Sequence, residues 1–462
     1  MLFCYYNLMF CQILLTFLLI NQSPELAAID RYINLLGPVH TGVSVVNCRN
    51  GVEIYSHQSR YLFVPASIQK LISVAGGFIL LGSEYRFQTN FYTDSVSGTN
   101  VYNLYVQGGA DPSLDTNQIK QFTGVLTGQG ITEVVGNIYI DPYGVDTTSL
   151  GSGWMWDEGY YSYSARISAL TCQGNCVELQ VNTSGGSINC SVEPNCAYTL
   201  LVDSFQYGSE HNPEISRIFE NGINVILLKG TVNRSFNQKI NLEKPHLYTG
   251  YLVREYLTRN NISCYGEVKE RPVNLNAQLV HSIHSPPYYQ LADSVLNFSI
   301  NLASELIIRK IGTLRNTQGT AQDGLDNILQ AFQSMGIETS NVKARDGSGL
   351  SRYNLVSPYF LTSLLEAMLS NNLCCEYFYR SLPIMGLEGT VSFRLREISN
   401  RNIRAKTGSL SGVSSLAGYV ENIHGDTLAF AIIMNNYTGS TSRIRNIQDS
   451  IVYVLLNMEV PR

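Results

Sequence analysis

The stretch PASIQKLISVA, residues 65–75, places a serine and a lysine three positions apart at the start of an apolar segment. A proline directly ahead of a periodic apolar run is typical of a helix start, so we expect Ser67 in the first turn and Lys70 on the same side. A serine attacks a carbonyl only when a base takes its proton, and a lysine with a lowered pKa is such a base. Taken alone, S-x-x-K is weak evidence, and it favours an ordinary helix with a capping serine and a solvated lysine.

Two further triplets follow along the chain. Ser299-Ile300-Asn301 is an S-x-N triplet within a long helical pattern, residues 288–311, and Lys406-Thr407-Gly408 is a K-T-G triplet on an expected strand. Each triplet alone is weak, because such residues are common on solvated helices and strands. S-x-x-K, S-x-N and K-T-G together, in this order, are the signature of the penicillin-recognising serine acyltransferases.

The resemblance extends beyond the three motifs. The segments RDGSGLSR (345–352), GLEGT (386–390) and AKTGSLSGV (405–413) are similar to those of the class C low-molecular-mass penicillin-binding proteins. Members of that class are D-alanyl-D-alanine carboxypeptidases and endopeptidases, and two extra domains interrupt their transpeptidase-like core. The wide interval between Lys70 and Ser299 resembles this arrangement. The resemblance covers nearly the whole mature chain.

This resemblance implies an α+β fold. We expect a transpeptidase/β-lactamase-like core, an antiparallel sheet flanked by helices, with two inserted β-rich domains. The predicted division of the chain is a signal peptide at 1–28, the catalytic core at 29–87 and 275–462, one inserted domain at 88–170 and 256–274, and a second, β-rich inserted domain at 171–255.

The resemblance also implies catalytic roles. Ser67 would attack the carbonyl of the penultimate D-alanine while a neutral Lys70 takes its proton. Ser299 would relay that proton towards the leaving amine. Asn301 would hold both Lys70 and the substrate amide. These four residues form the expected catalytic set.

Substrate binding is expected at the K-T-G strand. Lys406 would supply positive charge for the terminal carboxylate of the peptide and would help to lower the pKa of Lys70. The backbone N–H groups of Ser67 and Ser409 would form an oxyanion hole, since a tetrahedral intermediate requires donors aimed at one oxygen. The same resemblance adds Thr407 and Gly408 to this set.

Three acidic residues are further candidates. The segment GWMWDE, residues 153–158, resembles an inserted segment of the class in which an acid approaches the amino end of the stem-peptide side chain. Asp157 and Glu158 both fit this substrate-binding role, and a solvated loop acid is the alternative for either. Asp346 precedes Ser348 in a glycine-rich stretch that is either part of the site or a structural turn.

Composition and the N-terminus indicate the compartment. A chain of 462 residues suits two or three domains, and its net charge of −5 gives no indication of a nucleic-acid partner. The apolar segment 9–20, followed by a polar break and the small residues Ala27 and Ala28, predicts a signal peptide. We therefore expect export to the periplasm or cell-wall space of a bacterium. An uncleaved membrane anchor is the alternative to a cleaved signal peptide. Peripheral contact with the membrane is a further candidate interaction.

Four of the ten cysteines are clustered in the chain, at Cys172, Cys176, Cys190 and Cys196. In an exported protein this cluster predicts two local disulfides whose pairing the sequence leaves open. A zinc site is the alternative, although the C-x3-C and C-x5-C spacings are unusual for zinc and no histidine lies nearby. We expect no metal and no other cofactor.

The sequence thus predicts a serine D,D-peptidase that hydrolyses the terminal D-Ala-D-Ala bond of peptidoglycan stem peptides, with D-Ala cross-links as a further candidate substrate. β-Lactam antibiotics would inhibit it by acylating Ser67. One alternative is a β-lactamase or esterase on the same core, although no glutamate is evident that would activate a deacylating water. The other is an inactive wall-binding protein, which would have no need to keep all the motif residues. The sequence does not predict the oligomeric state.

Overall fold

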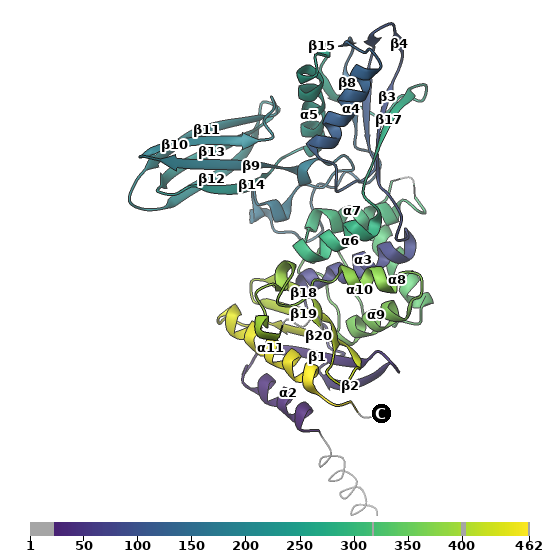
Figure 1. The fold of residues 1–462 in the computed structure, drawn as a ribbon, viewed down its shortest axis with the longest axis vertical. Helices are drawn as coiled ribbons and strands as arrows, with labels where there is room; N and C mark the ends of the chain where they lie inside the picture. Colours follow the sequence, from purple (N-terminus) through teal and green to yellow (C-terminus); the bar gives the residue numbers. More distant parts are fainter. Residues whose placement is uncertain (1–22, 317, 399–402, 461–462) are drawn as a thin grey trace, which may run out of the picture.

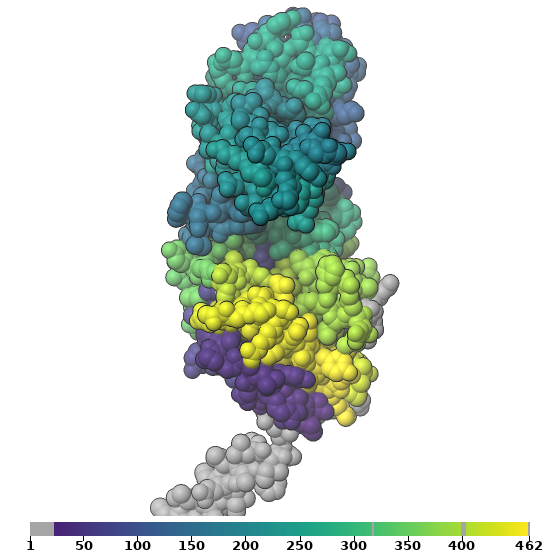
Figure 2. All heavy atoms as spheres, turned by 90° about the vertical axis from the view of Figure 1, so that its left-hand side faces the viewer, coloured from purple at the N-terminus to yellow at the C-terminus, as the bar shows by residue number. Residues whose placement is uncertain are grey.

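The computed structural model describes residues 23–316, 318–398 and 403–460. The molecule is elongated, with a core at one end and two inserted domains at the other (Figures 1 and 2). Residues 1–22, the larger part of the predicted signal peptide, lie outside the described residues. Ala27 and Ala28 lie within the first described helix, α2 (Pro24–Asn34). None of the helices in these three described ranges has the length and apolarity needed to cross a membrane.

The core is built on one antiparallel sheet with the strand order β18-β19-β20-β1-β2. Along its central strand β20, Ala429, Ala431 and Ile433 pack into one apolar cluster, and Leu428, Phe430 and Ile432 pack into another. Because successive side chains of a strand point to opposite faces, both faces of this sheet are covered. The strands are β1 (His40–Asn47), β2 (Val52–His57), β18 (Ile403–Leu410), β19 (Val413–Glu421) and β20 (Thr427–Asn435).

Helices cover the two faces of the sheet. On one face α9 packs against β1 and β20, and α3 and α6–α8 pack behind it, whereas α11 and α2 cover the other face (Figure 1). This is the antiparallel sheet flanked by helices that the sequence predicted. The helices are α3 (Lys70–Leu80), α6 (Tyr288–Phe298), α7 (Asn301–Gly312), α8 (Ala321–Ser334), α9 (Pro358–Ser370), α10 (Cys375–Ser381) and α11 (Thr441–Asn457).

The first insertion contains a five-stranded sheet in the order β16-β8-β6-β3-β17, with helices α4 and α5 beside it. A smaller sheet, β15-β7-β5-β4, lies at its far end (Figure 1). The strands are β3 (Gln88–Thr93), β4 (Val96–Ser97), β5 (Asn100–Val101), β6 (Leu104–Gly108), β7 (Glu133–Val134), β8 (Ile138–Asp141), β15 (Ser263–Cys264), β16 (Val268–Glu270) and β17 (Gln278–His284).

Two elements show how the insertions are joined. Helix α5 (Pro245–Arg259) spans the boundary predicted at 255/256, and it packs against α4 (Thr116–Gly128) and β8 of the first insertion. Strand β17, which the prediction assigned to the core, pairs with β3. At the junction with the core, the backbone N–H of Ser285 donates to the carbonyl of Phe87 at 2.9 Å, and the N–H of Phe87 donates to Ser285 Oγ at 2.9 Å. The chain therefore leaves and re-enters the core at adjacent points.

The second insertion consists of two three-stranded sheets, β10-β9-β14 and β11-β13-β12. It projects sideways from the molecule in Figure 1 and faces the viewer in Figure 2. Exposed and half-buried residues alternate along β12, as expected for a sheet with one face in water. The strands are β9 (Cys176–Ser184), β10 (Ser187–Glu193), β11 (Thr199–Tyr207), β12 (Asn212–Glu220), β13 (Ile223–Val232) and β14 (Phe236–Asn241).

The prediction of two local disulfides is wrong for this structure, because the described cysteines are all free thiols. Cys190 lies opposite Val181 in the β9/β10 pair, five positions along β9 from Cys176. Cys176 packs in the apolar cluster of the core, whereas Cys172 and Cys196 pack in the cluster of the insertions. Proximity in sequence therefore does not bring these thiols into two bonded pairs.

Candidate active site

Ser67 lies in a short 3-10 turn, Ala66–Gln69, that leads directly into α3. The predicted position in the first α-helical turn is thus replaced by a tighter turn. In a 3-10 helix residues three apart lie directly above one another, so this turn places the Ser67 and Lys70 side chains on the same side. The core sheet holds this turn in place, because Ser415 Oγ on β19 donates a 2.6 Å hydrogen bond to the carbonyl of Pro65.

Lys70 is fully buried and contacts three oxygen atoms. Its Nζ lies 3.1 Å from Ser67 Oγ, 2.6 Å from Asn301 Oδ1 and 2.6 Å from the carbonyl oxygen of Ser348. Burial lowers the pKa of Lys70 to about 7, although the negative charges of Asp346 and Glu305 act in the opposite direction. A substantial fraction of this amine is therefore neutral near pH 7.

These contacts orient the neutral amine. A neutral lysine has two N–H bonds and one lone pair. Asn301 Oδ1 and the Ser348 carbonyl can only accept hydrogen bonds, so they occupy the two N–H groups. The lone pair then remains for the third neighbour, the hydroxyl of Ser67. The geometry is that of a base held against a nucleophile.

The S-x-N triplet lies at a break between two helices, and the predicted continuous helix over 288–311 is wrong at this point. Helix α6 ends at Phe298, Ser299 adopts the left-handed conformation with a φ of 57°, and α7 begins at Asn301. The apolar period runs through the break, and no glycine or proline marks it. The break directs Ser299 into the cleft that also contains Ser67, while Asn301 contacts Lys70.

Two buried carboxylates, Asp346 within the loop 345–352 and Glu305 on α7, hold the loop whose Ser348 carbonyl contacts Lys70. Glu305 Oε1 accepts hydrogen bonds of 3.0 Å from the backbone N–H groups of both Gly347 and Ser348. Asp346 accepts from the backbone N–H groups of Gly349 (2.8 Å) and Ser351 (2.7 Å). The glycine-rich stretch is therefore a turn with a direct connection to the site, since its Ser348 carbonyl contacts the catalytic lysine.

The K-T-G triplet lies on β18, next to the turn that carries Ser67. Lys406 is buried, and its Nζ donates to the Thr407 carbonyl at 3.1 Å. Burial and then the charge of Lys70 lower the pKa of Lys406 well below its ordinary value. At Gly408 a Cβ would lie only 2.9 Å from the Ser67 nitrogen and 2.7 Å from the Pro65 carbonyl oxygen. Glycine is required here because β18 and the Ser67 turn are in backbone contact.

A cleft of about 330 Å³ opens over these groups. The sequence interpretation assigned no role to four residues on its walls, although one of them ends the GLEGT segment that resembles the family; the four are Thr390, Phe393, Arg394 and Arg445. Arg445 Nη2 donates to Ser409 Oγ at 3.2 Å, and Thr407 Oγ1 donates to Thr390 Oγ1 at 2.7 Å. No short motif marks Arg445, which α11 brings back to β18 from 36 positions further along the chain. The lining comprises Ser67, Ser299, Thr390, Phe393, Arg394, Thr407, Ser409 and Arg445.

Asp157 and Glu158, the two acids predicted to bind the side chain of the stem peptide, lie in a 3-10 turn, Trp156–Glu158. The segment that follows this turn contacts Asn301. Asp157 is exposed, and Glu158 is half-buried. Burial and the Glu158 carboxylate both raise the pKa of Tyr163. The carbonyl of Tyr163 accepts a 2.8 Å hydrogen bond from Asn301 Nδ2. Glu158 is therefore connected to the catalytic cleft through Tyr163.

A lysine-activated serine between a helical core and an antiparallel sheet defines the class of serine acyl-transfer enzymes that recognise penicillin. Within the described residues no three His, Cys, Asp or Glu side chains form a group that could hold a metal. Residues 26–458 match the D-Ala-D-Ala carboxypeptidase 3 (S13) family, and the chain belongs to that family. It is a serine D,D-peptidase of the low-molecular-mass penicillin-binding type, as the sequence predicted.

Relatives support this assignment along most of the chain. The chain is 29% identical over 424 residues to a D-alanyl-D-alanine carboxypeptidase of Actinomadura sp., covering 86% of this chain and 78% of the relative. It is 25% identical over 414 residues to the D-alanyl-D-alanine carboxypeptidase DacB of Haemophilus influenzae, covering 86% of each protein.

The solved structures agree with the fold. The crystal structure of penicillin binding protein 4 from Haemophilus influenzae matches with a TM-score of 0.81 at 23% identity, covering 93% of this chain and 99% of that chain. A structure of the same protein complexed with a novel β-lactam matches with a TM-score of 0.77 at 23% identity and the same coverage. The predicted α+β core with extra domains is thereby confirmed.

Proposed function

We propose that the enzyme hydrolyses the terminal D-Ala-D-Ala bond of peptidoglycan stem peptides through an acyl-enzyme on Ser67. The observation that carries this proposal is the environment of Lys70, whose lone pair faces the Ser67 hydroxyl while both N–H groups are occupied. Ser67 attacks the carbonyl of the penultimate D-alanine as its proton moves to Lys70. The C–O bond forms, and the developing oxyanion accepts hydrogen bonds from the backbone N–H groups of Ser67 and Ser409.

Collapse of this intermediate breaks the peptide bond. The proton held by Lys70 passes to the leaving amine of the terminal D-alanine through the hydroxyl of Ser299. Water then attacks the acyl-enzyme and releases the shortened peptide. Asn301 keeps the Lys70 amine and the substrate amide in register with Ser67 during both steps.

Recognition of the terminal carboxylate is assigned to the K-T-G strand. Lys406, Thr407 and Ser409 supply the charge and hydroxyl groups, and Arg445 adds a guanidinium beside Ser409. A bound carboxylate favours the protonated form of Lys406, because an opposite charge offsets the burial that lowers its pKa. Gly408 allows the strand to approach the Ser67 turn.

For the side chain of the stem peptide, we assign Glu158 as the principal acid and Asp157 as a solvated neighbour. Glu158 is the less exposed of the two, and it faces Tyr163 next to Asn301. An acid in this position would attract an amino group on the substrate. The pair of variants Glu158→Gln and Asp157→Asn, assayed with stem peptides that carry a free or an acetylated amino group, distinguishes the two roles.

β-Lactams are proposed to inhibit the enzyme by acylating Ser67. Acylation by penicillin is consistent with either a peptidase or a β-lactamase, and the two differ in how fast the acyl group is hydrolysed. None of the described residues that line the catalytic cleft is a carboxylate able to activate water, which favours the peptidase. We further propose export to the periplasm or cell-wall space, on the basis of the apolar segment 9–20.

The test uses a fluorescent penicillin with the wild type and the Ser67→Ala variant. Stable labelling of the wild type alone, together with release of D-alanine from a stem pentapeptide, is the expected result. Rapid loss of the label would indicate a β-lactamase, and a folded protein without label or hydrolysis would indicate an inactive wall-binding protein. Parallel incubation with cross-linked dimers measures endopeptidase activity.

A further inference from the structure

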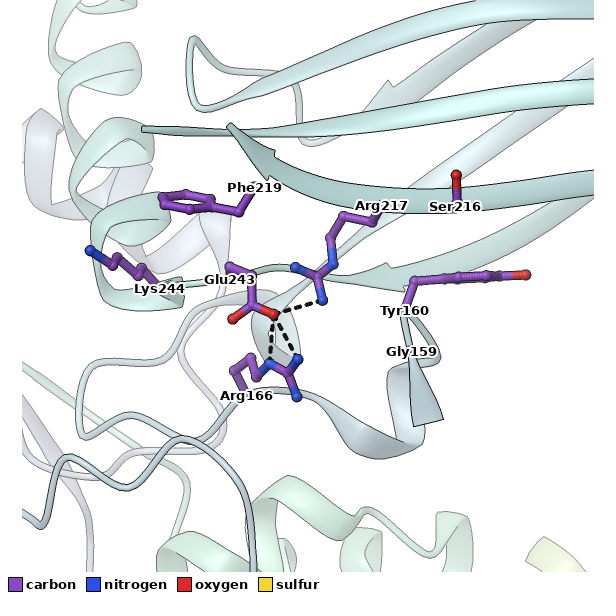
Figure 3. Close-up of a pocket in the computed structure, with 8 residues that line it drawn as sticks. All are labelled: Gly159, Tyr160, Arg166, Ser216, Arg217, Phe219, Glu243 and Lys244. Carbon is purple, nitrogen blue, oxygen red and sulfur yellow. Dashed lines mark hydrogen bonds and ion pairs between the residues drawn. The ribbon is translucent and has the colours of Figure 1, made fainter. Parts of the chain in front are cut away.

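A second cavity, separate from the catalytic cleft, lies where the second insertion meets the segment 159–166 (Figure 3). Its volume is about 480 Å³. Figure 3 shows the Glu243 carboxylate between the guanidinium groups of Arg166 and Arg217, with Lys244 and Tyr160 at the two sides. The walls thus carry three cations and one carboxylate, which leaves a surplus of positive charge.

The charges in this cavity are only partly compensated. Arg166 contacts Glu243 Oε1 through Nε (2.9 Å) and Nη2 (2.7 Å), and Arg217 Nη2 contacts the same oxygen at 2.9 Å. Burial opposes ionisation of Glu243, but the two guanidinium groups outweigh it and lower the pKa of Glu243. Glu243 is therefore an anion that neutralises one of its two arginines.

Arg217 is the second, independent indication of a ligand. Only 5% of its side chain is exposed, and its Nε is buried without a hydrogen-bond partner among the described residues. An unpaired donor on a buried cation is costly unless a ligand or an ion completes it. Next to it, Lys244 lines the cavity and directly precedes α5 in the left-handed conformation, where its side chain makes no capping hydrogen bond.

The cavity is physically linked to the catalytic cleft. The ring of Tyr160, in the cavity, stacks on Tyr161 with centroids 4.7 Å apart, and Tyr161 stacks on Tyr163 at 5.4 Å. The Tyr163 carbonyl contacts Asn301 of the catalytic cleft. Asn241 Nδ2 anchors this row of rings by donating to the Tyr161 carbonyl at 2.8 Å. Tyr161 and Tyr163 are partly exposed, so the rings form a surface between the two sites.

We propose that this cavity is a remote substrate subsite, which binds a carboxylate of the peptidoglycan substrate outside the scissile D-Ala-D-Ala pair. The inference rests on the proposed function, because it requires a peptidoglycan fragment in the catalytic cleft. The guanidinium groups of Arg166 and Arg217 match the planar geometry of a carboxylate. The Glu243 carboxylate already occupies some of their N–H groups. Because the tyrosine rings stack on one another, the row presents mainly ring edges to the part of the substrate that lies between the two sites.

The test compares a short and a long substrate. The short one is a blocked tripeptide ending in D-Ala-D-Ala, and the long one is a disaccharide pentapeptide whose internal carboxylates are either free or amidated. The variant is Lys244→Asn, because asparagine tolerates the left-handed conformation and the Lys244 side chain is exposed. Lys229→Asn, which removes an exposed charge from β13 outside the cavity, is the matched control.

We expect Lys244→Asn to raise KM about five- to tenfold for the long substrate with free carboxylates, as for the loss of one charge-assisted contact. The amidated long substrate should show a high KM with the wild type and no further change in the variant. Cleavage of the short peptide and acylation by penicillin should be unchanged, and Lys229→Asn should behave as the wild type.

The double variant Lys244→Asn/Arg217→Gln tests the site more severely, with penicillin acylation as the check that the protein is folded. Suppose that the double variant reacts with penicillin and is therefore folded. A wild-type KM for the long substrate would then overturn the inference, and so would an equal loss of activity on the short and the long substrate. Failure of the proposed function has a different signature. In that case the wild type itself neither reacts with penicillin nor cleaves the short peptide.

Discussion

The indole Nε1 of Trp154 donates a 3.0 Å hydrogen bond to Oδ2 of the buried Asp346. Trp154 belongs to the first insertion, whereas Asp346 belongs to the core loop whose Ser348 carbonyl contacts Lys70. The inserted segment therefore takes part in holding the catalytic base. A contact of this kind, between a buried donor and a buried carboxylate, is expected to matter both for stability and for catalysis.

Replacing Trp154 with phenylalanine tests this contact. The variant removes one of the three hydrogen bonds that Asp346 Oδ2 accepts from described residues. We therefore expect a loss of about 1–3 kcal/mol in the free energy of unfolding and a lower rate of penicillin acylation. Chemical denaturation and stopped-flow acylation measure the two effects. Trp156→Phe is the control, because the Trp156 side chain is 92% exposed. Equal stability of the two variants would contradict a role for the Trp154–Asp346 contact.

The pH dependence of acylation reports the pKa of Lys70. Acylation requires the neutral amine, so kcat/KM should rise with pH through a midpoint near pH 7, where burial has placed the pKa of Lys70. Glu305 and Asp346 act to raise this pKa. Neutralising Glu305 as Glu305→Gln should therefore move the midpoint to lower pH. A midpoint that moves upward, or one that does not respond, would exclude electrostatic control of Lys70 by this carboxylate.

Gly408→Ala should reduce activity sharply. The added Cβ would lie 2.2 Å from Ser415 Oγ and 2.9 Å from the Ser67 nitrogen, so β18 must move away from the proposed oxyanion hole. Misplacing one oxyanion donor lowers kcat by about 100-fold or more. Steady-state kinetics with a D-Ala-D-Ala peptide measure the effect. Gly439→Ala is the matched control, since its Cβ meets no atom within 4 Å; comparable losses in both variants would argue against a specific effect at Gly408.

Arg445→Gln should weaken binding of the terminal carboxylate. The guanidinium lies beside Ser409 on the wall of the cleft, so its removal should raise KM about tenfold and leave the folded state intact. Arg443→Gln, two positions earlier on α11 and outside the cleft lining, is the control. With a substrate amidated at its terminal carboxylate, Arg445→Gln and the wild type should have the same KM. A difference in KM with this substrate would show that Arg445 acts on another part of the substrate.

The sequence predicted the arrangement of the candidate catalytic residues correctly where they lie close together within one helix turn or one strand. Ser67 and Lys70 are three positions apart, so any helical turn brings them together, and the K-T-G triplet lies on a strand with an obvious apolar pattern. The break at Ser299 was not predictable from that pattern, since the apolar period continues and serine is uncommon in the left-handed conformation. Tertiary packing, which has no signature in a short motif, creates it.

Two other features also depend on tertiary packing. Arg445 reaches Ser409 only because α11 lies against the sheet next to β19, and this contact joins residues 36 positions apart. The free thiols of the second insertion reflect strand register, which places Cys190 opposite Val181 rather than near Cys176. Spacing along the chain gives no information on either arrangement.

The hydrogen bonds between Phe87 and Ser285 have a consequence for the evolution of the enzyme. Relative to the core, residues 88–284 form one continuous insertion. Its two ends are held together by the hydrogen bonds between Phe87 and Ser285, as the two ends of a hairpin loop are. The outer parts of such an insertion can grow, shrink or be exchanged without moving the turn that carries Ser67, provided that the contacts of Trp154 with Asp346 and of Tyr163 with Asn301 are kept. Natural recombination and protein engineering therefore have, at this pair of residues, a ready point of exchange for altering substrate reach while the chemistry is kept.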